Sequence, residues 1–186
     1  MKIQICALVA AVLLSATAHA QTATVAAPAT PPSPPPACAA PEHRQFDFWV
    51  GRWDVFDPKS GKRVGESLIE KVYHGCGIRE NWQPQKDQGG SLNIYVPAQK
   101  QWFQTWIDAQ GSRGEFAGGW NGKAMVIEGD WPAPADPAKP NRVRMTYTPN
   151  PDGSVLQEGI SSADGGKSWK PSFAFLYRHH AEAPAP

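Results

Sequence analysis

A glutamate lies where strand alternation could turn it toward an apolar interior. Glu80 stands two residues after Ile78 and two before Trp82. Side chains two apart share one face of a β-strand, so an inward face would bury this carboxyl group. A buried charge needs a partner, and Arg142 or Arg144 is the partner we predict. Such a pair would hold the polar end of a ligand; the alternative is that these residues face outward and are solvated.

Aromatic residues are the second feature with binding chemistry. The chain holds eight tryptophans, and the segment Q-W-F-Q-T-W places Trp102, Gln104 and Trp106 on one face of a strand. Together with Trp82, they would line a cavity for a flat or apolar ligand, or stack on sugars. They could equally fill the interior of a small barrel, and both interpretations remain open.

Metal and catalytic chemistry find less support. Metal sites require convergent ligands, and the histidines beyond residue 20 are scattered or stand as a pair near the end of the chain: His43, His74, His179 and His180. The chain contains no G-x-S-x-G, H-E-x-x-H or phosphate-binding loop. We therefore predict no metal site, no cofactor and no catalytic residue.

The first twenty residues have the pattern of a secretory signal peptide. A basic start at Lys2 precedes an apolar run over 3–14, and Ala18-His19-Ala20 supplies small residues for cleavage. The apolar run is short for a membrane span, which is the alternative interpretation. We expect removal of 1–20, export to the periplasm or beyond the cell, and no transmembrane span.

Cysteine usage agrees with export. Cys6 lies in the predicted signal peptide, which leaves Cys38 and Cys76. In an oxidising compartment a remaining pair usually joins, so we predict a disulfide between these two residues.

Charge excludes one class of partner. The chain has 18 basic and 17 acidic residues, and Lys2 is the one charged residue within 1–20, so the remaining chain is formally neutral. Nucleic acids and anionic membranes are bound chiefly through positive charge. We predict no nucleic-acid partner, and the sequence does not indicate an oligomeric state.

Composition divides the chain into four parts. Residues 21–41 are rich in Ala, Thr and Pro and cannot bury a core, so we predict a disordered linker. Residues 42–180 form the predicted domain, and 181–186 form a disordered tail.

The domain is predicted to be all-β. Gly, Pro and Asp recur between short alternating segments, and no sustained helical period is found. Asn121-Gly122 has the composition of a two-residue hairpin turn. A single antiparallel up-and-down β-barrel of about ten strands is predicted, with an open sandwich as the alternative. The strands are expected at 49–56, 63–73, 78–83, 91–96, 101–108, 114–120, 123–130, 142–148, 155–161 and 172–178.

The first predicted strand carries an unusual aromatic pair. Trp49, Gly51, Trp53 and Val55 share one face, and the glycine leaves room for a large ring to lie across it. Trp53 would then close one end of the barrel with a large rigid ring.

These residues carry a family resemblance. Gly51-Arg52-Trp53 is similar to the G-x-W signature of the calycins, which include lipocalins and fatty-acid-binding proteins. That resemblance implies that a late arginine, here Arg178, packs across Trp53. The stretch 46–55, followed by Gly75-Cys76 and R-E-N-W, also looks like a family of secreted bacterial domains of unknown function with a lipocalin-like fold. The resemblance implies a barrel and an internal cavity, and no activity.

A second motif lies near the end of the domain. Residues 162–169 resemble the Asp-box, S-x-D-x-G-x-[ST]-W, which occurs in hairpin turns of sialidases and other β-proteins. Asp164 would accept hydrogen bonds from turn amides, and Trp169 would return to the sheet. The resemblance implies a structural role.

Three functions are compatible with these patterns. The first is an exported barrel that binds a small apolar or amphipathic ligand through Glu80, Trp82, Trp102, Gln104, Trp106 and Arg144. The second is a filled barrel that acts as an envelope interaction module. The third is a haem-binding barrel, as in the ten-stranded nitrobindins, or an isomerase.

Overall fold

The computed structural model describes residues 38–84, 87–133 and 136–181. The predicted signal peptide 1–20, the predicted linker as far as residue 37 and the last five residues of the chain lie outside these ranges. None of the helices in the described ranges is long and apolar enough to cross a membrane. The described ranges contain three short 3-10 helices: η1 (Pro41–Arg44), η2 (Asp47–Trp49) and η3 (Tyr73–Gly75).

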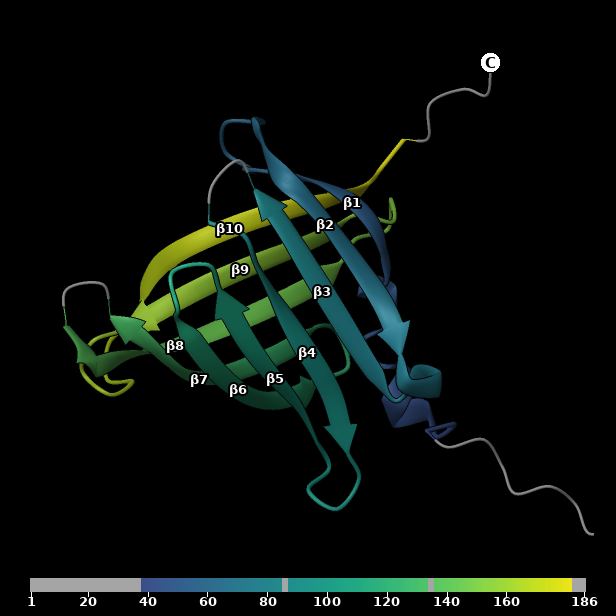
Figure 1. The fold of residues 1–186 in the computed structure, drawn as a ribbon, viewed down its shortest axis with the longest axis horizontal. Helices are drawn as coiled ribbons and strands as arrows, with labels where there is room; N and C mark the ends of the chain where they lie inside the picture. The colour runs from purple at the N-terminus through teal and green to yellow at the C-terminus, as the bar shows by residue number, and fades with distance from the viewer. Residues whose placement is uncertain (1–37, 85–86, 134–135, 182–186) are drawn as a thin grey trace, which may run out of the picture. The chain divides into compact units, whose positions relative to one another are not determined.

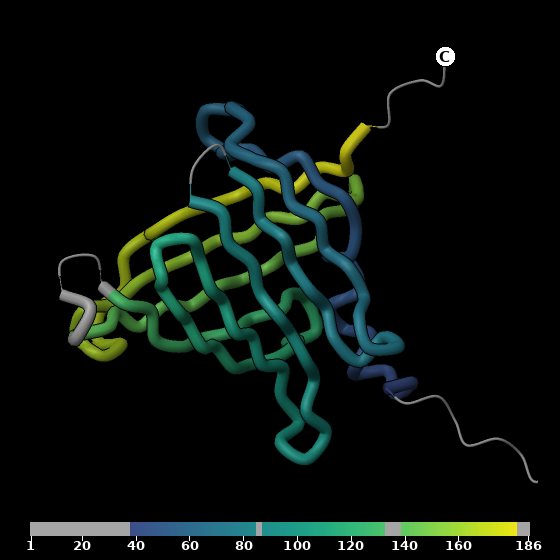
Figure 2. The backbone as a smooth tube through the Cα atoms, viewed as in Figure 1, coloured from purple at the N-terminus to yellow at the C-terminus, as the bar shows by residue number. Residues whose placement is uncertain are grey.

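The described residues form ten β-strands that close into one barrel (Figure 1, Figure 2). Each strand is antiparallel to its neighbours in sequence, and β1 pairs with both β2 and β10. The predicted up-and-down barrel is therefore confirmed, and the open sandwich is wrong. The strands are β1 (Gly51–Phe56), β2 (Arg63–Val72), β3 (Gly77–Pro84), β4 (Gly89–Val96), β5 (Gln101–Asp108), β6 (Arg113–Trp120), β7 (Met125–Ala133), β8 (Asp136–Pro149), β9 (Val155–Ser162) and β10 (Lys170–His179).

Alternation decides which side chains fill the interior. In β5, Trp102 and Gln104 are buried, whereas Thr105 and Ile107 are exposed. In β8, Val143 and Met145 are likewise buried. A period of two is what a closed sheet with one inner and one outer face requires.

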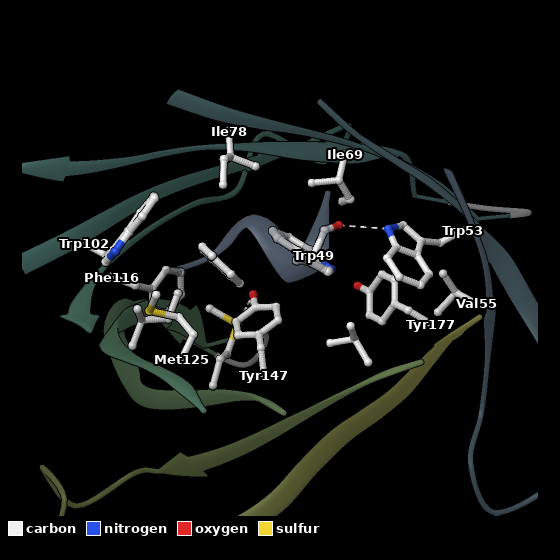
Figure 3. Packing of buried hydrophobic residues seen from close by; sticks show 14 of the residues in the cluster. Trp49, Trp53, Val55, Ile69, Ile78, Trp102, Phe116, Met125, Tyr147 and Tyr177 are labelled. Carbon is white, nitrogen blue, oxygen red and sulfur yellow. Dashed lines mark hydrogen bonds between the residues drawn. The ribbon is translucent and has the colours of Figure 1, made fainter. Parts of the chain in front are cut away.

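The segment that precedes β1 fills part of the interior. Trp49 was expected in the first strand, but it lies in η2, and its ring is fully buried. Phe46 stacks on Trp49 at a centroid distance of 4.9 Å and meets the ring of Tyr147 edge-on at 5.0 Å. Trp53 donates its Nε1–H to the carbonyl of Trp49 at 2.9 Å (Figure 3). Residues 46–49, a single-turn helix and the residue before it, thus carry two large rings into the barrel, and the carbonyl of Trp49 satisfies the buried indole of Trp53.

The ring that covers Trp53 belongs to His179. The two rings stack with centroids 4.0 Å apart and planes 22° apart. The arginine implied by the calycin resemblance does not take this place: the guanidinium of Arg178 lies 5.3 Å from the ring of Phe56. Strand register is the reason, because Trp53 pairs with His179, and Arg178 points to the opposite face of β10.

Gly51 makes room for this stack. A Cβ atom at Gly51 would stand 3.4 Å from Cε1 of His179 and 3.4 Å from Cε2 of Trp53. The glycine is therefore covered by the two rings that close this end of the barrel.

The predicted disulfide between Cys38 and Cys76 is confirmed. Their Cα atoms are 5.1 Å apart. Arg44 strengthens the same junction, because its Nη2 donates to the carbonyl of Cys38 at 2.9 Å and to that of Gly75 at 2.6 Å. The start of the domain is thereby fixed to the β2–β3 connection.

The turn between β6 and β7 differs from the prediction. Trp120 pairs with Met125, so four residues form the turn instead of the expected two. Asn121 causes the difference, because its Oδ1 accepts the amides of Lys123 at 2.9 Å and Ala124 at 2.8 Å. An asparagine side chain that caps its own turn in this way replaces the tight two-residue geometry.

The β9–β10 hairpin is organised by Asp164. Its Oδ1 accepts the amides of Lys167 at 3.0 Å and Ser168 at 2.9 Å, and the hydroxyl of Ser162 at 2.6 Å. These hydrogen bonds, that of Ser162 foremost, hold the pKa of Asp164 well below its usual range. The next residue beyond this loop, Trp169, lies under the guanidinium of Arg144, 4.5 Å from the ring centroid.

Candidate ligand-binding cavity

A cavity of about 360 Å³ lies inside the barrel beside the buried core. It lies toward the β7–β8 and β9–β10 hairpins, since Trp131 and Ser172 are among its walls. Tyr177, which packs with Trp49 and Trp53 in the core (Figure 3), also lines the cavity. The walls are formed by Glu80, Trp82, Gln104, Trp106, Trp131, Pro132, Asn141, Val143, Met145, Tyr147, Gln157, Ser161, Ser172, Phe173, Phe175 and Tyr177.

Three tryptophans and two phenylalanines are among the apolar residues that line this cavity. Trp82 of β3 and Phe175 of β10 lie 5.4 Å apart, and Trp106 of β5 and Trp131 of β7 lie 5.8 Å apart. Phe173 extends the first pair, 5.4 Å from Phe175. Aromatic walls with a few polar groups are the usual composition of a small-molecule site.

Glycines on the neighbouring strands give two of these rings their positions. A Cβ atom at Gly159 would lie 2.2 Å from Cε1 of Phe173, and one at Gly89 would lie 2.5 Å from Cζ2 of Trp106. Both rings therefore lie flat across a bare backbone. A side chain at either glycine would push the ring away from the barrel wall.

Glu80 is the acidic group of the cavity, and it faces inward, which is one of the two orientations that the sequence left open. Only 6% of its surface is exposed. Ser91 donates its hydroxyl to Oε2 at 2.9 Å, and Ser67 donates to Oε1 at 3.4 Å. Burial raises the pKa of Glu80 to about 7, and the two hydroxyl bonds oppose that rise.

The cationic partner predicted for Glu80 is absent from this site. Arg144 lies on the outer face of β8, where it pairs with Glu128 at 2.7 Å, and Arg142 pairs with the same carboxylate at 2.5 Å. The reason is again alternation, because the inward residues of β8 are Val143 and its neighbours at spacing two. Among the described residues that line the cavity, none is Arg, Lys or His.

A chain of hydrogen bonds extends from Glu80 across the interior. Ser91 accepts from Nδ2 of Asn93 at 3.0 Å, and Oδ1 of Asn93 accepts from Nε2 of Gln104 at 2.8 Å. Gln104 also approaches the hydroxyl of Tyr147 at 3.4 Å. Buried polar groups that are satisfied in this way fix one another's orientation.

The same chain continues to β9 and β10. Nε2 of Gln157 donates to the hydroxyl of Tyr147 at 3.0 Å, and the hydroxyl of Tyr177 donates to Oε1 of Gln157 at 2.7 Å. Burial, and then the negative charge of Glu80, raise the pKa of Tyr147 and the pKa of Tyr177 above their usual value. Both tyrosines therefore remain neutral.

One donor on the cavity wall has no protein partner. Nε1 of Trp106 is buried and makes no hydrogen bond to any of the described residues. A buried donor without an acceptor costs free energy.

Trp102 was predicted beside Trp106 but lies outside the cavity. It meets the ring of Phe46 edge-on at 5.7 Å and donates its Nε1–H to Gln45 at 3.3 Å. The segment before β1 covers it, which the alternation of β5 alone could not reveal. The structure thus brings together Glu80 and Gln104 with Trp82 and Trp106, and separates Trp102 and Arg144 from them.

Several wall residues were missed by the sequence analysis. Tyr147 and Phe175 could have been found from the sequence, because each lies on a strand with a clear period of two. Gln157 could have been found in the same way, because it lies two residues from Val155 and two from Gly159. Trp131 gave no such signal, because it stands next to a proline-rich loop.

A second depression lies on the outer face of β3, β4 and β5, with a volume of about 780 Å³. Its apolar residues include Leu92, Ile94 and Ile107, of which Ile107 is 60% exposed. Within the described ranges, no group of three or more His, Cys, Asp or Glu side chains is placed to hold a metal ion.

Comparison of the chain with protein-family models and with curated proteins finds no match. Function is therefore inferred from the cavity and its side chains.

Proposed function

We propose that this chain is an exported, calycin-like barrel that binds a small amphipathic molecule in its interior. The observation that carries the proposal is the cavity of about 360 Å³ between Trp82, Trp106 and Phe175. Its size falls within the range of about 300–1,000 Å³ that is typical of small-molecule sites.

The walls favour a ligand with an apolar body and one polar end. Two pairs of aromatic rings supply apolar walls, and Glu80 supplies a buried polar group. A few placed polar groups among apolar walls fix the orientation of a bound molecule. The alternative of a filled barrel is less well supported, because the core around Trp49 occupies only part of the interior.

Export is supported by two features. The disulfide Cys38–Cys76 is of the kind that persists in oxidising compartments. The pattern of Lys2, an apolar run and Ala18-His19-Ala20 is that of a secretory signal peptide. The proposed location is the periplasm or the cell exterior.

Titration with N-phenyl-1-naphthylamine tests the binding proposal. The emission of this neutral probe rises in an apolar environment, and a saturable rise is expected with the wild-type protein. Val143→Phe places a ring in the cavity and should abolish the rise, because Val143 is buried on its wall. Ser161→Phe is a second blocking variant nearer the β9–β10 hairpin.

Ile107→Ser is the matched control. It removes apolar surface from the outer depression and leaves the interior unchanged. Binding that survives both blocking variants but is lost in Ile107→Ser would place the probe outside and contradict the proposal. Far-UV circular dichroism verifies that each variant remains folded.

A further inference from the structure

We infer that the cavity selects a ligand whose polar end is a protonated amine and rejects an anionic one of the same size. This inference rests on the proposed function and names the ligand class for that site. The amine would pair with the carboxylate of Glu80, and the apolar body would lie against the rings of Trp82, Trp106 and Phe175.

The first support is the charge of the site. Glu80 is 6% exposed, and its hydrogen-bond partners among the described residues are two serine hydroxyls. Glu128 differs from Glu80, because its charge is compensated by salt bridges with Arg142 and Arg144. An ionised carboxylate in a low-dielectric cavity attracts a cation and repels a second anion.

The second support is the direction of the hydrogen bonds around Glu80. The hydroxyls of Ser67 and Ser91 each donate to one of its oxygens. Each carboxylate oxygen can accept more than one hydrogen bond, so acceptor capacity remains. An ammonium group supplies three donors and no acceptor, which matches that capacity.

The third support comes from the aromatic walls. The face of an indole or phenyl ring is negative, so a cation within about 6 Å of the ring centre is attracted. Trp82 and Phe175 form one wall of the cavity, and Trp106 and Trp131 form another.

Binding of an amine should also depend on pH. The groups that face Glu80 are Ser67 of β2, Ser91 of β4, Tyr147 of β8 and Tyr177 of β10, and none of them is a cation. The pKa of Glu80 is about 7, so its ionised fraction rises across neutral pH. A ligand that remains protonated should bind about tenfold more tightly at pH 8 than at pH 6.

Three probes with one ring system test the inference: 2-(1-naphthyl)ethylamine, 2-(1-naphthyl)ethanol and 1-naphthylacetate. Each is titrated into the protein by isothermal calorimetry at pH 8. The amine should bind at least about tenfold more tightly than the alcohol, because a charge-assisted hydrogen bond replaces a neutral one. The acetate should bind more weakly than the alcohol.

Glu80→Gln provides the decisive variant, because it keeps the shape of the side chain and removes its charge. It should lower the affinity for the amine to that of the alcohol, and the affinity for the alcohol should stay nearly unchanged. Glu128→Gln, a change on the outer face, is the matched control and should alter none of the three affinities. If Glu80→Gln fails to fold, the comparison of the wild-type protein at pH 6 and pH 8 replaces it.

Equal affinity for amine and alcohol, or tighter binding of the acetate, would overturn the inference and leave the proposed function intact. A tenfold preference for the amine that persists in Glu80→Gln would overturn it as well. If none of the three probes binds and N-phenyl-1-naphthylamine does not bind either, the proposed function fails, and the inference fails with it.

Discussion

The hydroxyl of Ser91 donates a hydrogen bond of 2.9 Å to Oε2 of Glu80 inside a barrel wall that offers this acid no cation among the described residues of the cavity. Burial raises the pKa of Glu80 from an ordinary 4.5 to about 7. The folded protein therefore retains a proton that the unfolded chain releases.

This difference predicts how stability depends on pH. Because the folded pKa of Glu80 is raised, its contribution is fully present below pH 4.5 and is lost as pH rises to about 7. The loss should be about 3 kcal/mol in the free energy of unfolding. Urea unfolding of wild type and Glu80→Gln at pH 5, 6, 7 and 8 measures it.

The variant isolates Glu80 from the other acids. Asp54, Glu66 and Glu128 have lowered pKa values, so their contributions are lost only as pH falls into the acid range. The difference between wild type and Glu80→Gln cancels these contributions. A difference that is constant from pH 5 to pH 8 would mean that Glu80 has an ordinary pKa.

Gly159 is predicted to control the shape of the cavity. In Gly159→Ala the new methyl group would lie 2.2 Å from Cε1 of Phe173, so the ring must move away from the wall. We expect the free energy of unfolding to fall by about 1–3 kcal/mol and the probe to bind more weakly. Gly119→Ala is the matched control in another strand, because nothing lies within 4 Å of its Cβ position. If the two substitutions change stability and probe binding equally, the position of Phe173 does not depend on Gly159.

The closed end of the barrel allows a test of which residue covers Trp53. A double-mutant cycle with Trp53→Leu and His179→Ala should give a coupling energy of about 0.5–1.5 kcal/mol, the usual range for stacked rings. The cycle with Arg178→Ala should give a coupling near zero, since that guanidinium lies over Phe56. The reverse order of the two couplings would restore the arrangement implied by the calycin resemblance.

The disulfide should contribute strongly to stability. Cys38 and Cys76 are separated by 38 positions in the sequence. Replacing both with serine should lower the free energy of unfolding by about 3–4 kcal/mol, because the unfolded chain loses a long loop constraint. Urea unfolding with and without a reductant measures the effect. If a reductant lowers the free energy of unfolding of the wild type no more than that of the double variant, the prediction is wrong.

Much of the fold could be predicted from the sequence because its signals are local. A period of two separates the inner from the outer residues of β5, β8 and β10, and turn residues mark where strands end. The same rule left the inward and the outward position of Glu80 both open, because alternation does not say which face of a strand is the inner one. An up-and-down order then needs only neighbouring strands to pair.

The errors arose where a contact depends on register or on distant parts of the chain. Arg178 and His179 differ by one position, and a shift of one exchanges the two faces of β10. Trp102 and Trp106 share a face of β5, yet Phe46 covers only the first of them. No local sequence pattern indicates how far the segment before β1 extends into the barrel.

A crystal structure of the protein with 2-(1-naphthyl)ethylamine tests the central claim most directly. We predict the nitrogen within about 3 Å of a carboxylate oxygen of Glu80, with the ring system between Trp82 and Trp106. Occupation of the outer depression beside Ile107, or an amine that points away from Glu80, would contradict the account.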